Sequence, residues 1–495
     1  MQYWKPRAEE EFAGDMMPYW DGEQFHLFYL LDRNHHAEQC GLGGHQWAHA
    51  STTNLVDWEH HPLALPIGAP GTADQNGICT GSIFEHEGVY HAFYAARFKR
   101  PDGSVYEAVC RAAGQDLIHF EKSPDNPMFS EQPGLDPRNH RDPFVFQHPT
   151  TRVFHMLVTA SRPPGDPADV GPERGVLAHY TADDLDSWRY QGPFLPLDKD
   201  PSPECPEHFF WNGWWYLVYS QHAQLQYWIS RDPLGPWERT HGGTLEGRTL
   251  TVPRTAEWKD GRRLEVGFLP WRRDGRDKED YVYAGNVVFR ELIQNADGRW
   301  TTRFVPEMMP RTGPPIAWQL HAPSPNVVLE PDGAISLNAS DGLPTAHIPD
   351  VPTDAVLTLH IVLSAGVTEY GLLLRADANL ETGYRLRFLP GENQVELRRW
   401  PAQNTGPKVI ASGVENLDSA TDVTVCLADS VIDVCINERH TLIERCFDHR
   451  GMHLGLFATT GQARIENLCI AASRVQKTMF PANRETARSI HASIE

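Results

Sequence analysis

The sequence predicts an all-β protein in which a five-bladed β-propeller is followed by a C-terminal β-sandwich. A strand rich in aromatic residues recurs, a polar turn separates its copies, and beyond a proline-rich segment the pattern changes to plain alternation. Several short strands per repeat, with no helical periodicity, are typical of propellers and sandwiches. The aromatic strand occurs at 22–30, 88–96, 153–160 and 213–220.

The polar turns define the repeat length. Each ends in an aromatic residue, and they lie at 51–58, 114–120, 181–188 and 230–237. A spacing of roughly 50 to 70 residues is typical of units that need their neighbours to bury both faces. A fifth, less regular copy follows at 261–271. We therefore expect five blades within residues 1–305.

The remainder divides into three parts. Prolines concentrate in 306–325, which we interpret as a linker. Residues 326–474 alternate apolar and polar side chains, as in Tyr384-Arg-Leu-Arg-Phe388, and predict a β-sandwich of the concanavalin-like kind. Residues 475–495 show no strand pattern and form a C-terminal tail.

Charge and composition exclude several classes of partner. The 495 residues contain 44 Lys and Arg against 65 Asp and Glu, a net charge of −21, which argues against nucleic acid and anionic membranes. No apolar stretch is long enough to span a bilayer. The 15 Trp, 15 Tyr and 21 Phe supply aromatic faces on which sugars can stack.

The cysteines and the N-terminus indicate a reducing compartment. The eight cysteines are scattered, with no close pair spaced for zinc and no dense disulfide pattern. The first residues lack the apolar run of a secretory signal. We expect a cytoplasmic protein, or a secreted one if a leader has been removed.

Three carboxylates recur at about one phase of the repeat. Asp15, Asp142 and Glu204 each precede an aromatic strand by a similar offset, while Thr80 and Arg254 take that phase in the second and fifth copies. Equivalent positions in successive blades lie at equivalent places around the ring, so we expect the three acids to converge.

Converging carboxylates indicate acid–base chemistry on a glycosidic bond, which needs one acid and a second carboxylate on the opposite side of the anomeric carbon. Glu204 precedes an apolar strand, where desolvation would favour the protonated form of a general acid. Asp142 directly follows Arg141, so we expect it to stay ionised. Asp15 has apolar neighbours and no adjacent base.

Several motifs resemble glycoside hydrolase family 32, the fructan hydrolases and invertases. Arg141-Asp-Pro143 is similar to the family's Arg-Asp-Pro motif, and Glu204-Cys-Pro206 to its Glu-Cys-Pro motif. Gly77-Ile-Cys-Thr-Gly-Ser82 resembles its Phe-Ser-Gly-Ser segment, and Trp47-Ala-His-Ala50 its Trp-Gly-His-Ala segment. Phe289-Arg-Glu-Leu292 is similar to the Pro-Arg-Glu-Leu strand near the end of the family's propeller.

The resemblance implies a retaining double displacement on β-fructofuranosides such as sucrose, fructo-oligosaccharides or fructans. Asp15 would be the nucleophile, Glu204 the acid/base and Asp142 the stabiliser of the transition state. The substrate-binding candidates are Arg141, Thr80, Cys79, Trp47 and His49.

The first blade departs from the family pattern. Gly14 stands where the family has an asparagine before the nucleophile. Leu30 replaces a glutamine, and Leu42 replaces a tryptophan. Losing three such contacts would weaken a standard fructose subsite by about 1 kcal/mol or more each. An unusual fructoside or another furanoside is therefore an open alternative.

Other functions stay open at this stage. They are an inverting arabinofuranosidase or xylosidase of the related propeller families, a fructosyltransferase, and a non-catalytic sugar-binding propeller. We expect no cofactor, and no metal, because the clustered histidines match no standard ligand spacing. The expected partner is a disaccharide or oligosaccharide, and the sandwich is a candidate contact for a homodimer.

Overall fold

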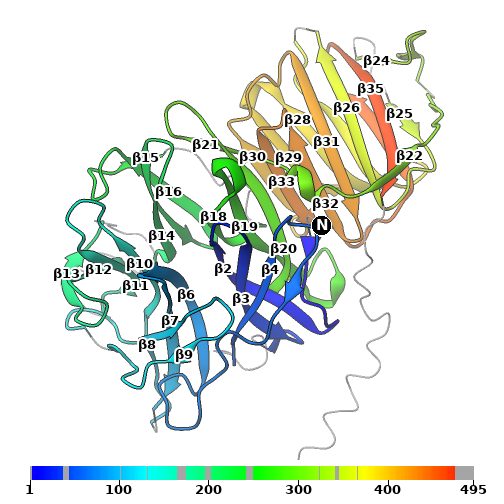
Figure 1. The fold of residues 1–495 in the computed structure, drawn as a ribbon. Coiled ribbons are helices and arrows are strands. Elements are labelled where there is room, and N and C mark those ends of the chain that lie inside the picture. Colours follow the sequence, from blue (N-terminus) through cyan, green and yellow to red (C-terminus); the bar gives the residue numbers. More distant parts are fainter. Residues whose placement is uncertain are drawn as a thin grey trace, which may run out of the picture.

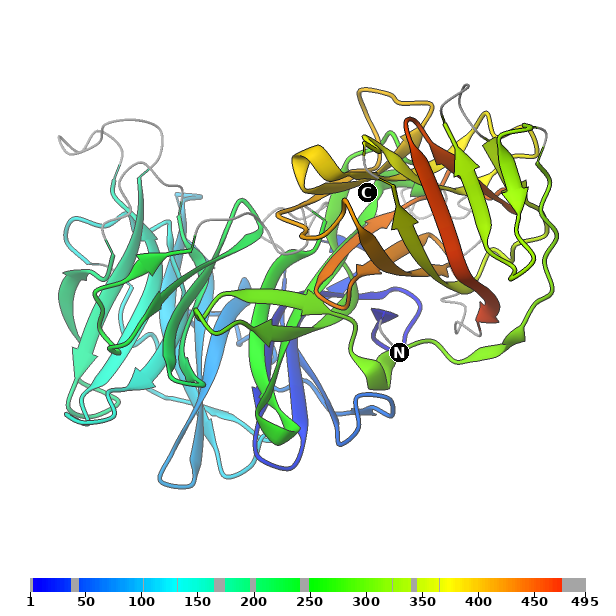
Figure 2. The same ribbon diagram turned by 90° about the horizontal axis from the view of Figure 1, so that it is seen from above.

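The computed structural model describes residues 3–36, 44–100, 102–130, 132–163, 174–195, 202–240, 249–322, 324–339, 345–364 and 366–473. They form two β-rich parts, a propeller in blue to green and a sandwich in yellow to red (Figure 1). Viewed from above, the two parts lie side by side with the N-terminus at their junction (Figure 2). No helix in the described residues is both long and apolar enough to cross a membrane.

The propeller consists of five four-stranded blades, as the repeats predict. The aromatic run of each repeat is the second strand of its blade. β3, β11 and β15 are almost entirely buried because neighbouring blades cover both faces of each sheet. In chain order the blade strands are β2 (Glu11–Trp20), β3 (Phe25–Arg33), β4 (Trp47–Thr52), β5 (Glu59–His60); β6 (Gly77–His86), β7 (Val89–Lys99), β8 (Val105–Gly114), β9 (Glu121–Lys122); β10 (His140–Gln147), β11 (Phe154–Ser161), β12 (Gly175–Ala182), β13 (Arg189–Pro193); β14 (Glu204–Trp211), β15 (Trp214–Gln221), β16 (Gln224–Ser230), β17 (Glu238–Arg239); β18 (Thr251–Trp258), β19 (Arg262–Arg272), β20 (Tyr281–Gln294), β21 (Trp300–Arg303).

The ring is closed between the first and last blades. β20 of the fifth blade pairs with β2 of the first at Ala13↔Gly285, and β1 (Tyr3–Trp4) also pairs with β20. Gly285 is required here, because a Cβ atom would lie 1.9 Å from the Leu269 carbonyl oxygen. The two ends of the propeller therefore share one continuous sheet.

Every innermost strand carries a β-bulge at the same place. Two residues of the inner strand oppose a single residue of the second strand, which disrupts the alternation of side chains and redirects them. The bulged pairs are Gly14–Asp15, Cys79–Thr80, Asp142–Pro143, Cys205–Pro206 and Val252–Pro253.

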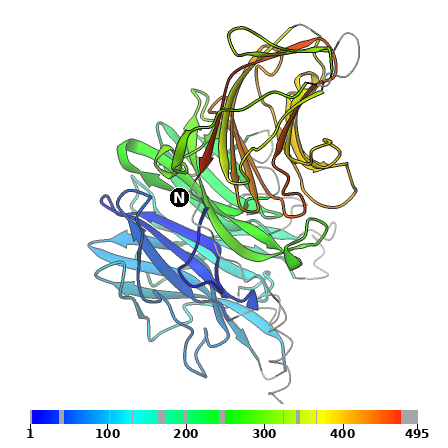
Figure 3. The same ribbon diagram turned by 90° about the vertical axis from the view of Figure 1, so that its right-hand side faces the viewer.

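The C-terminal part is a sandwich of two antiparallel sheets, seen from the side in Figure 3. Tyr384, Leu386 and Phe388 point into its core, whereas Arg385 and Arg387 are half-buried on the opposite face, as the alternation predicts. β22 (Thr312–Pro315), within the segment interpreted as a linker, pairs with the last strand of the larger sheet. That sheet contains β22, β23 (Val327–Leu329), β24 (Ile335–Asn338), β26 (Ala355–Leu363), β31 (Ala420–Ala428), β32 (Val431–Ile436), β33 (His440–Arg445) and β35 (Gln462–Ser473); the smaller contains β25 (Thr345–Ile348), β27 (Tyr370–Ala376), β28 (Gly383–Leu389), β29 (Gln394–Trp400), β30 (Lys408–Ser412) and β34 (His453–Ala458).

Buried polar groups connect the propeller to the sandwich. Arg290 on β20 and Asp433 on β32 form an ion pair at 2.7 Å, with both side chains fully buried. The Tyr3 hydroxyl donates to Asp433 at 2.8 Å, and Arg445 donates to the carbonyls of Leu269 and Pro270. Because breaking a buried pair leaves an uncompensated charge, these contacts hold the two parts in one arrangement. The predicted tail, 475–495, lies outside the described residues.

Candidate active site

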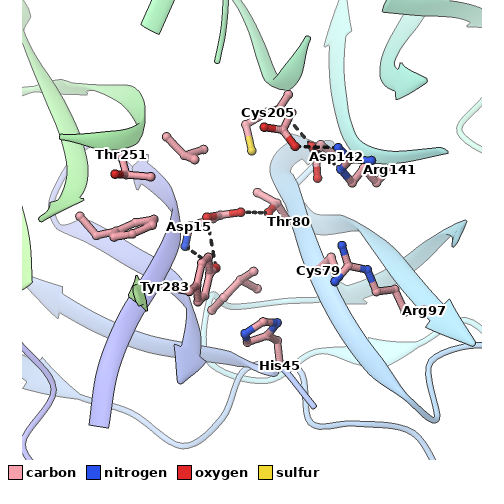
Figure 4. Close-up of a pocket in the computed structure, with 14 residues that line it drawn as sticks. Asp15, His45, Cys79, Thr80, Arg97, Arg141, Asp142, Cys205, Thr251 and Tyr283 are labelled. Carbon is pink, nitrogen blue, oxygen red and sulfur yellow. Dashed lines mark hydrogen bonds and ion pairs between the residues drawn. The ribbon is translucent and has the colours of Figure 1, made fainter. Parts of the chain in front are cut away.

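One pocket of about 400 Å³ receives side chains from all five blades. Asp15, Asp142 and Glu204 all line it, so the structure brings the three predicted acids together. The close-up shows Asp15 and Asp142 on different strands across the pocket from each other, with Thr80 between them (Figure 4). The predicted convergence of the acids is therefore seen in the geometry.

The bulges explain how the acids reach this pocket, and they correct the predicted alignment. Asp15 and Thr80 are each the second residue of a bulged pair, and Asp142 is the first. Glu204 directly precedes the bulge of its blade, beside Cys205. The acids thus occupy three successive positions rather than one phase, and all three face the pocket because each bulge redirects its neighbours.

Arg254 does not take the phase of the acids. The pairing of β18 with β19 places it at the position that Glu207 has in the fourth blade. Both side chains are buried, with Arg254 Nε 3.5 Å from Glu207 Oε1, and neither lines the pocket. Thr251 and Val252 face the pocket from the fifth blade instead. The prediction for Arg254 was wrong because a sequence comparison does not register the bulge.

Asp15 is held by hydroxyl groups. Thr80 Oγ1 donates to Asp15 Oδ2 at 2.9 Å, and the Tyr283 hydroxyl donates to Oδ1 at 3.1 Å. Burial, with the charges of Asp142 and Glu204, raises the pKa of Asp15 to about 6, although the two hydroxyls oppose this. The carboxylate is therefore oriented, and its negative charge is only weakly stabilised.

Asp142 is fixed at the back of the pocket. Its Oδ2 accepts hydrogen bonds from the Cys205 amide at 3.1 Å and from the Thr159 hydroxyl at 3.2 Å. Its backbone has φ 55°, a left-handed conformation that is strained for a residue with a side chain. Burial raises its pKa even though Arg141 lowers it. The expectation that Arg141 would decide the charge of Asp142 misjudged the larger effect, which is desolvation.

Glu204 lies at the more open side of the pocket. Its side chain is 36% exposed, and Arg141 Nη2 donates to Glu204 Oε1 at 2.6 Å. This contradicts the expectation of a desolvated glutamate. Arg141 Nε is also 3.7 Å from Asp142 Oδ2, so one guanidinium group bridges two of the acids. An exposed carboxyl can exchange protons with solvent.

The other substrate-binding candidates divide into two groups. Thr80 and Cys79 line the pocket, and burial raises the pKa of Cys79 to about 12, so that it is a neutral thiol. Trp47 is fully buried and donates from Nε1 to the Cys79 carbonyl, behind the pocket wall. His49 is also buried, stacked on Phe28, and does not line the pocket.

Three lining residues with ionisable side chains are not evident from sequence motifs: Tyr283, His45 and Arg97. Tyr283 is near the C-terminal end of the propeller in sequence, and Arg97 lies two residues before the end of an aromatic strand. Neither ring nitrogen of His45 has a hydrogen-bond partner in the described part of the chain. Burial lowers the pKa of His45 to about 3, so the ring is neutral and offers one donor and one acceptor. Among the described residues no group of three or more His, Cys, Asp or Glu is arranged to hold a metal ion. Leu42 lies outside the described residues.

A propeller with three convergent carboxylates, followed by a sandwich, is the architecture of a class of glycoside hydrolases. Residues 15–232 match the model of the glycosyl hydrolases family 32 N-terminal domain. These residues therefore form an N-terminal domain of glycoside hydrolase family 32.

Individual relatives agree with this assignment. The chain is 25% identical over 310 residues to the sucrose-6-phosphate hydrolase of Escherichia coli, covering 58% of this chain and 61% of the relative. It is 27% identical over 273 residues to that of Bacillus subtilis (strain 168), covering 51% of this chain and 53% of the relative. The matched region thus spans little more than half of these relatives.

Solved structures share the fold over nearly the whole chain. Sucrose-6-phosphate hydrolase from Lactobacillus gasseri superposes with a TM-score of 0.67 at 18% identity, covering 96% of this chain and 93% of the other. Fructan 1-exohydrolase IIa from Cichorium intybus gives 0.68 at 14% identity, covering 96% and 97%. Both parts of the architecture are therefore common to these enzymes.

Proposed function

We propose that this protein hydrolyses terminal β-fructofuranosyl bonds in a disaccharide or short oligosaccharide, with retention of configuration. The observation that carries the proposal is the convergence of Asp15, Asp142 and Glu204 on one pocket, from three different blades. Two carboxyl groups on opposite sides of a glycosidic bond are what this chemistry requires.

The relatives support the choice of sugar. Their names specify sucrose-6-phosphate, raffinose and fructan as substrates. Sucrose, its 6-phosphate, raffinose and fructans all contain a β-linked fructofuranosyl group, so this group is what the proposed pocket would recognise. A pocket of about 400 Å³ suits a terminal sugar better than the middle of a polymer, which favours exo action.

The geometry suits a distinct role for each acid. Asp15, oriented by two hydroxyl groups and weakly stabilised as an anion, would attack the anomeric carbon and form an ester bond to it. Glu204, at the open side, would give its proton to the departing glycosidic oxygen as the carbon–oxygen bond breaks. Water would then replace Asp15, transferring a proton to Glu204 and restoring both groups.

Asp142 and Arg141 would act on the sugar without reacting. Asp142 is buried and fixed by the Cys205 amide and the Thr159 hydroxyl, so it would hold sugar hydroxyls and stabilise positive charge on the ring. Arg141 would keep Glu204 and Asp142 in place. His45, with two ring nitrogens unpartnered among the described residues, would bind a further hydroxyl of the sugar.

The alternative functions receive less support. The family match and the relatives are not arabinofuranosidases or xylosidases. A binding protein would have no need for three carboxylates, one of them at a strained φ. A fructosyltransferase would use the same acids and differ only in the molecule that accepts the sugar, so the products decide between transfer and hydrolysis.

Incubation with defined sugars tests the proposal. We expect fructose to be released from at least one of sucrose, sucrose-6-phosphate, raffinose, 1-kestose, inulin and levan, and no arabinose to be released from arabinofuranosides. Proton NMR of the first product should show the β-anomer, as retention requires. Asp15→Asn and Glu204→Gln should remain folded and lose turnover. Wild-type rates in either variant, or an α-anomer, would contradict the assignment.

Dimerisation through the sandwich stays a prediction from the sequence. Analytical ultracentrifugation of the full chain tests it, because a dimer doubles the sedimenting mass.

A further inference from the structure

Tyr283 reaches the pocket through a distortion of its own strand. Pro270 pairs with Gly285 and Trp271 with Val282, so Tyr283 and Ala284 bulge out of β20. Ala284 has φ 66°, a backbone conformation that is uncommon for residues other than glycine. A bulge with a strained residue beside an active site redirects a side chain at a cost in stability.

Neighbouring groups then fix the ring of Tyr283. Phe268 packs against it edge to face, with ring centroids 5.3 Å apart, and the His45 ring lies at 5.1 Å. A ring nitrogen of His35 contacts the Tyr283 carbonyl oxygen at 3.0 Å. Burial and the charge of Asp15 raise the pKa of Tyr283, so its hydroxyl stays protonated and can donate.

The hydroxyl group makes two contacts with one residue. It donates to Asp15 Oδ1 at 3.1 Å and accepts from the Asp15 amide at 3.1 Å. With Thr80 donating to Oδ2, both oxygens of the carboxylate are held, so its plane is fixed relative to the pocket. Because it contacts both groups, Tyr283 couples the orientation of the Asp15 side chain to that of the Asp15 backbone.

Tyr283 also fills the space beside position 14. A Cβ atom on Gly14 would lie 2.2 Å from the Tyr283 hydroxyl oxygen, which is a severe clash, and the three nearest atoms all belong to this ring. Gly14 does not have a positive φ, so its backbone would accept other residues. Glycine is therefore required at position 14 by Tyr283 rather than by the backbone.

We propose that Tyr283 is a positioning residue for Asp15, and that Gly14 and Tyr283 together replace an asparagine at position 14. This rests on the proposed role of Asp15 as nucleophile. The hydroxyl group from the last blade orients the carboxylate, and glycine leaves room for it. The loss of the family's asparagine in the first blade is thus compensated by the last blade, which adjoins the first where the ring closes.

Tyr283→Phe tests the positioning role, because it keeps the ring and removes only the hydroxyl group. We expect kcat/KM on the best sugar to fall about 10- to 100-fold, mainly through kcat. The acid limb of the pH profile should move to higher pH, since a donor to the carboxylate is lost. The other charged and titratable groups that line the pocket stay unchanged; they are Asp142, Glu204, Arg141, Arg97, Cys79, Cys205 and His45.

Tyr94→Phe is the matched control. Tyr94 is also a buried tyrosine that donates to an aspartate, Asp74 at 3.2 Å, but it does not line the pocket. It should leave the pH profile where it is. An unchanged profile and unchanged kcat for Tyr283→Phe, or the same shift in Tyr94→Phe, would overturn the proposal.

A measurement without substrate separates this inference from the proposed function. The pKa of Asp15, followed by carboxylate NMR, should rise in Tyr283→Phe even if no fructoside is cleaved. An unaltered pKa of Asp15 would refute the positioning role, whatever the enzyme does.

The exchange at position 14 tests the second half of the proposal. Gly14→Asn alone should inactivate or destabilise the protein, because the new side chain meets the Tyr283 ring. Adding Tyr283→Ala should raise kcat/KM at least tenfold above that of Gly14→Asn alone, or restore folding if the single variant does not fold. Full activity of Gly14→Asn alone, or a double variant no better than it, would contradict the exchange.

Discussion

Replacing Asp15 by asparagine should stabilise the protein at neutral pH while it abolishes turnover. In the folded protein the pKa of Asp15 is about 6, against an ordinary value of 3.8. Between these values Asp15 binds more protons in the folded state than in the unfolded state. The contribution of Asp15 to the free energy of unfolding therefore falls as pH rises through this range and is constant above it. Asparagine has no charge to desolvate and escapes this loss.

The size of the effect follows from the same two pKa values. At about 1.4 kcal/mol per pKa unit, ionised Asp15 costs about 3 kcal/mol at pH 7.5 and about 1 kcal/mol at pH 4.5. Asparagine can still accept from one hydroxyl and donate to the other, so few contacts are lost. At about 2.1 cal/mol/K per residue, 3 kcal/mol corresponds to a Tm rise of about 3 °C if all 495 residues unfold together. The rise is larger if the propeller melts alone.

Scanning calorimetry of both proteins at about pH 7.5 and pH 4.5 measures this difference. Asp136→Asn is the control of opposite sign, because hydrogen bonds from Arg138 lower the pKa of Asp136 and its charge stabilises the fold. If Asp15→Asn is no more stable than the wild type at pH 7.5, or if its advantage does not shrink at pH 4.5, then Asp15 is not a desolvated carboxylate.

Four further outcomes follow from the structure. The acid limb of kcat/KM should fall with an apparent pKa near 6, because Asp15 must be ionised to attack; a profile flat down to about pH 4.5 would contradict this. Arg141→Ala should lower kcat/KM by about 100-fold or more, since two carboxylates lose their common partner, and a loss below about threefold in steady-state assays would refute this role. His45→Phe should raise KM more than it lowers kcat, if the ring binds a sugar hydroxyl; an unchanged KM would exclude that contact. Asp433→Ala should destabilise the protein by about 3–5 kcal/mol in calorimetry, because the substitution breaks the buried ion pair with Arg290; a change under about 1 kcal/mol would contradict this role of the pair.

Much of the fold could be predicted because blade strands are buried on both faces. Such strands appear in the sequence as aromatic and apolar runs, and β3, β7, β11, β15 and β19 lie where those runs are. Sandwich strands alternate because one face is buried, and this too is visible in sequence. The fold class follows from these local patterns alone.

The detail of the site could not be predicted, because it depends on register and burial. A bulge places two residues opposite one, so Arg254 aligns with Glu207 although the sequence aligned it with the acids. The sequence also does not reveal that Asp142 is more strongly affected by burial than by Arg141. Tyr283 belongs to no motif, and the only sequence signal for it is a glycine at position 14, far away in the chain.

The closure of the ring also sets when the pocket can be completed during synthesis. Asp15 leaves the ribosome early, whereas the strand bearing Tyr283 is translated only after the other four blades. At about 5–20 residues per second, the nascent first blade waits for tens of seconds before β20 can cover its edge. Over that interval the edge of β2 that later pairs with β20 is open to other chains.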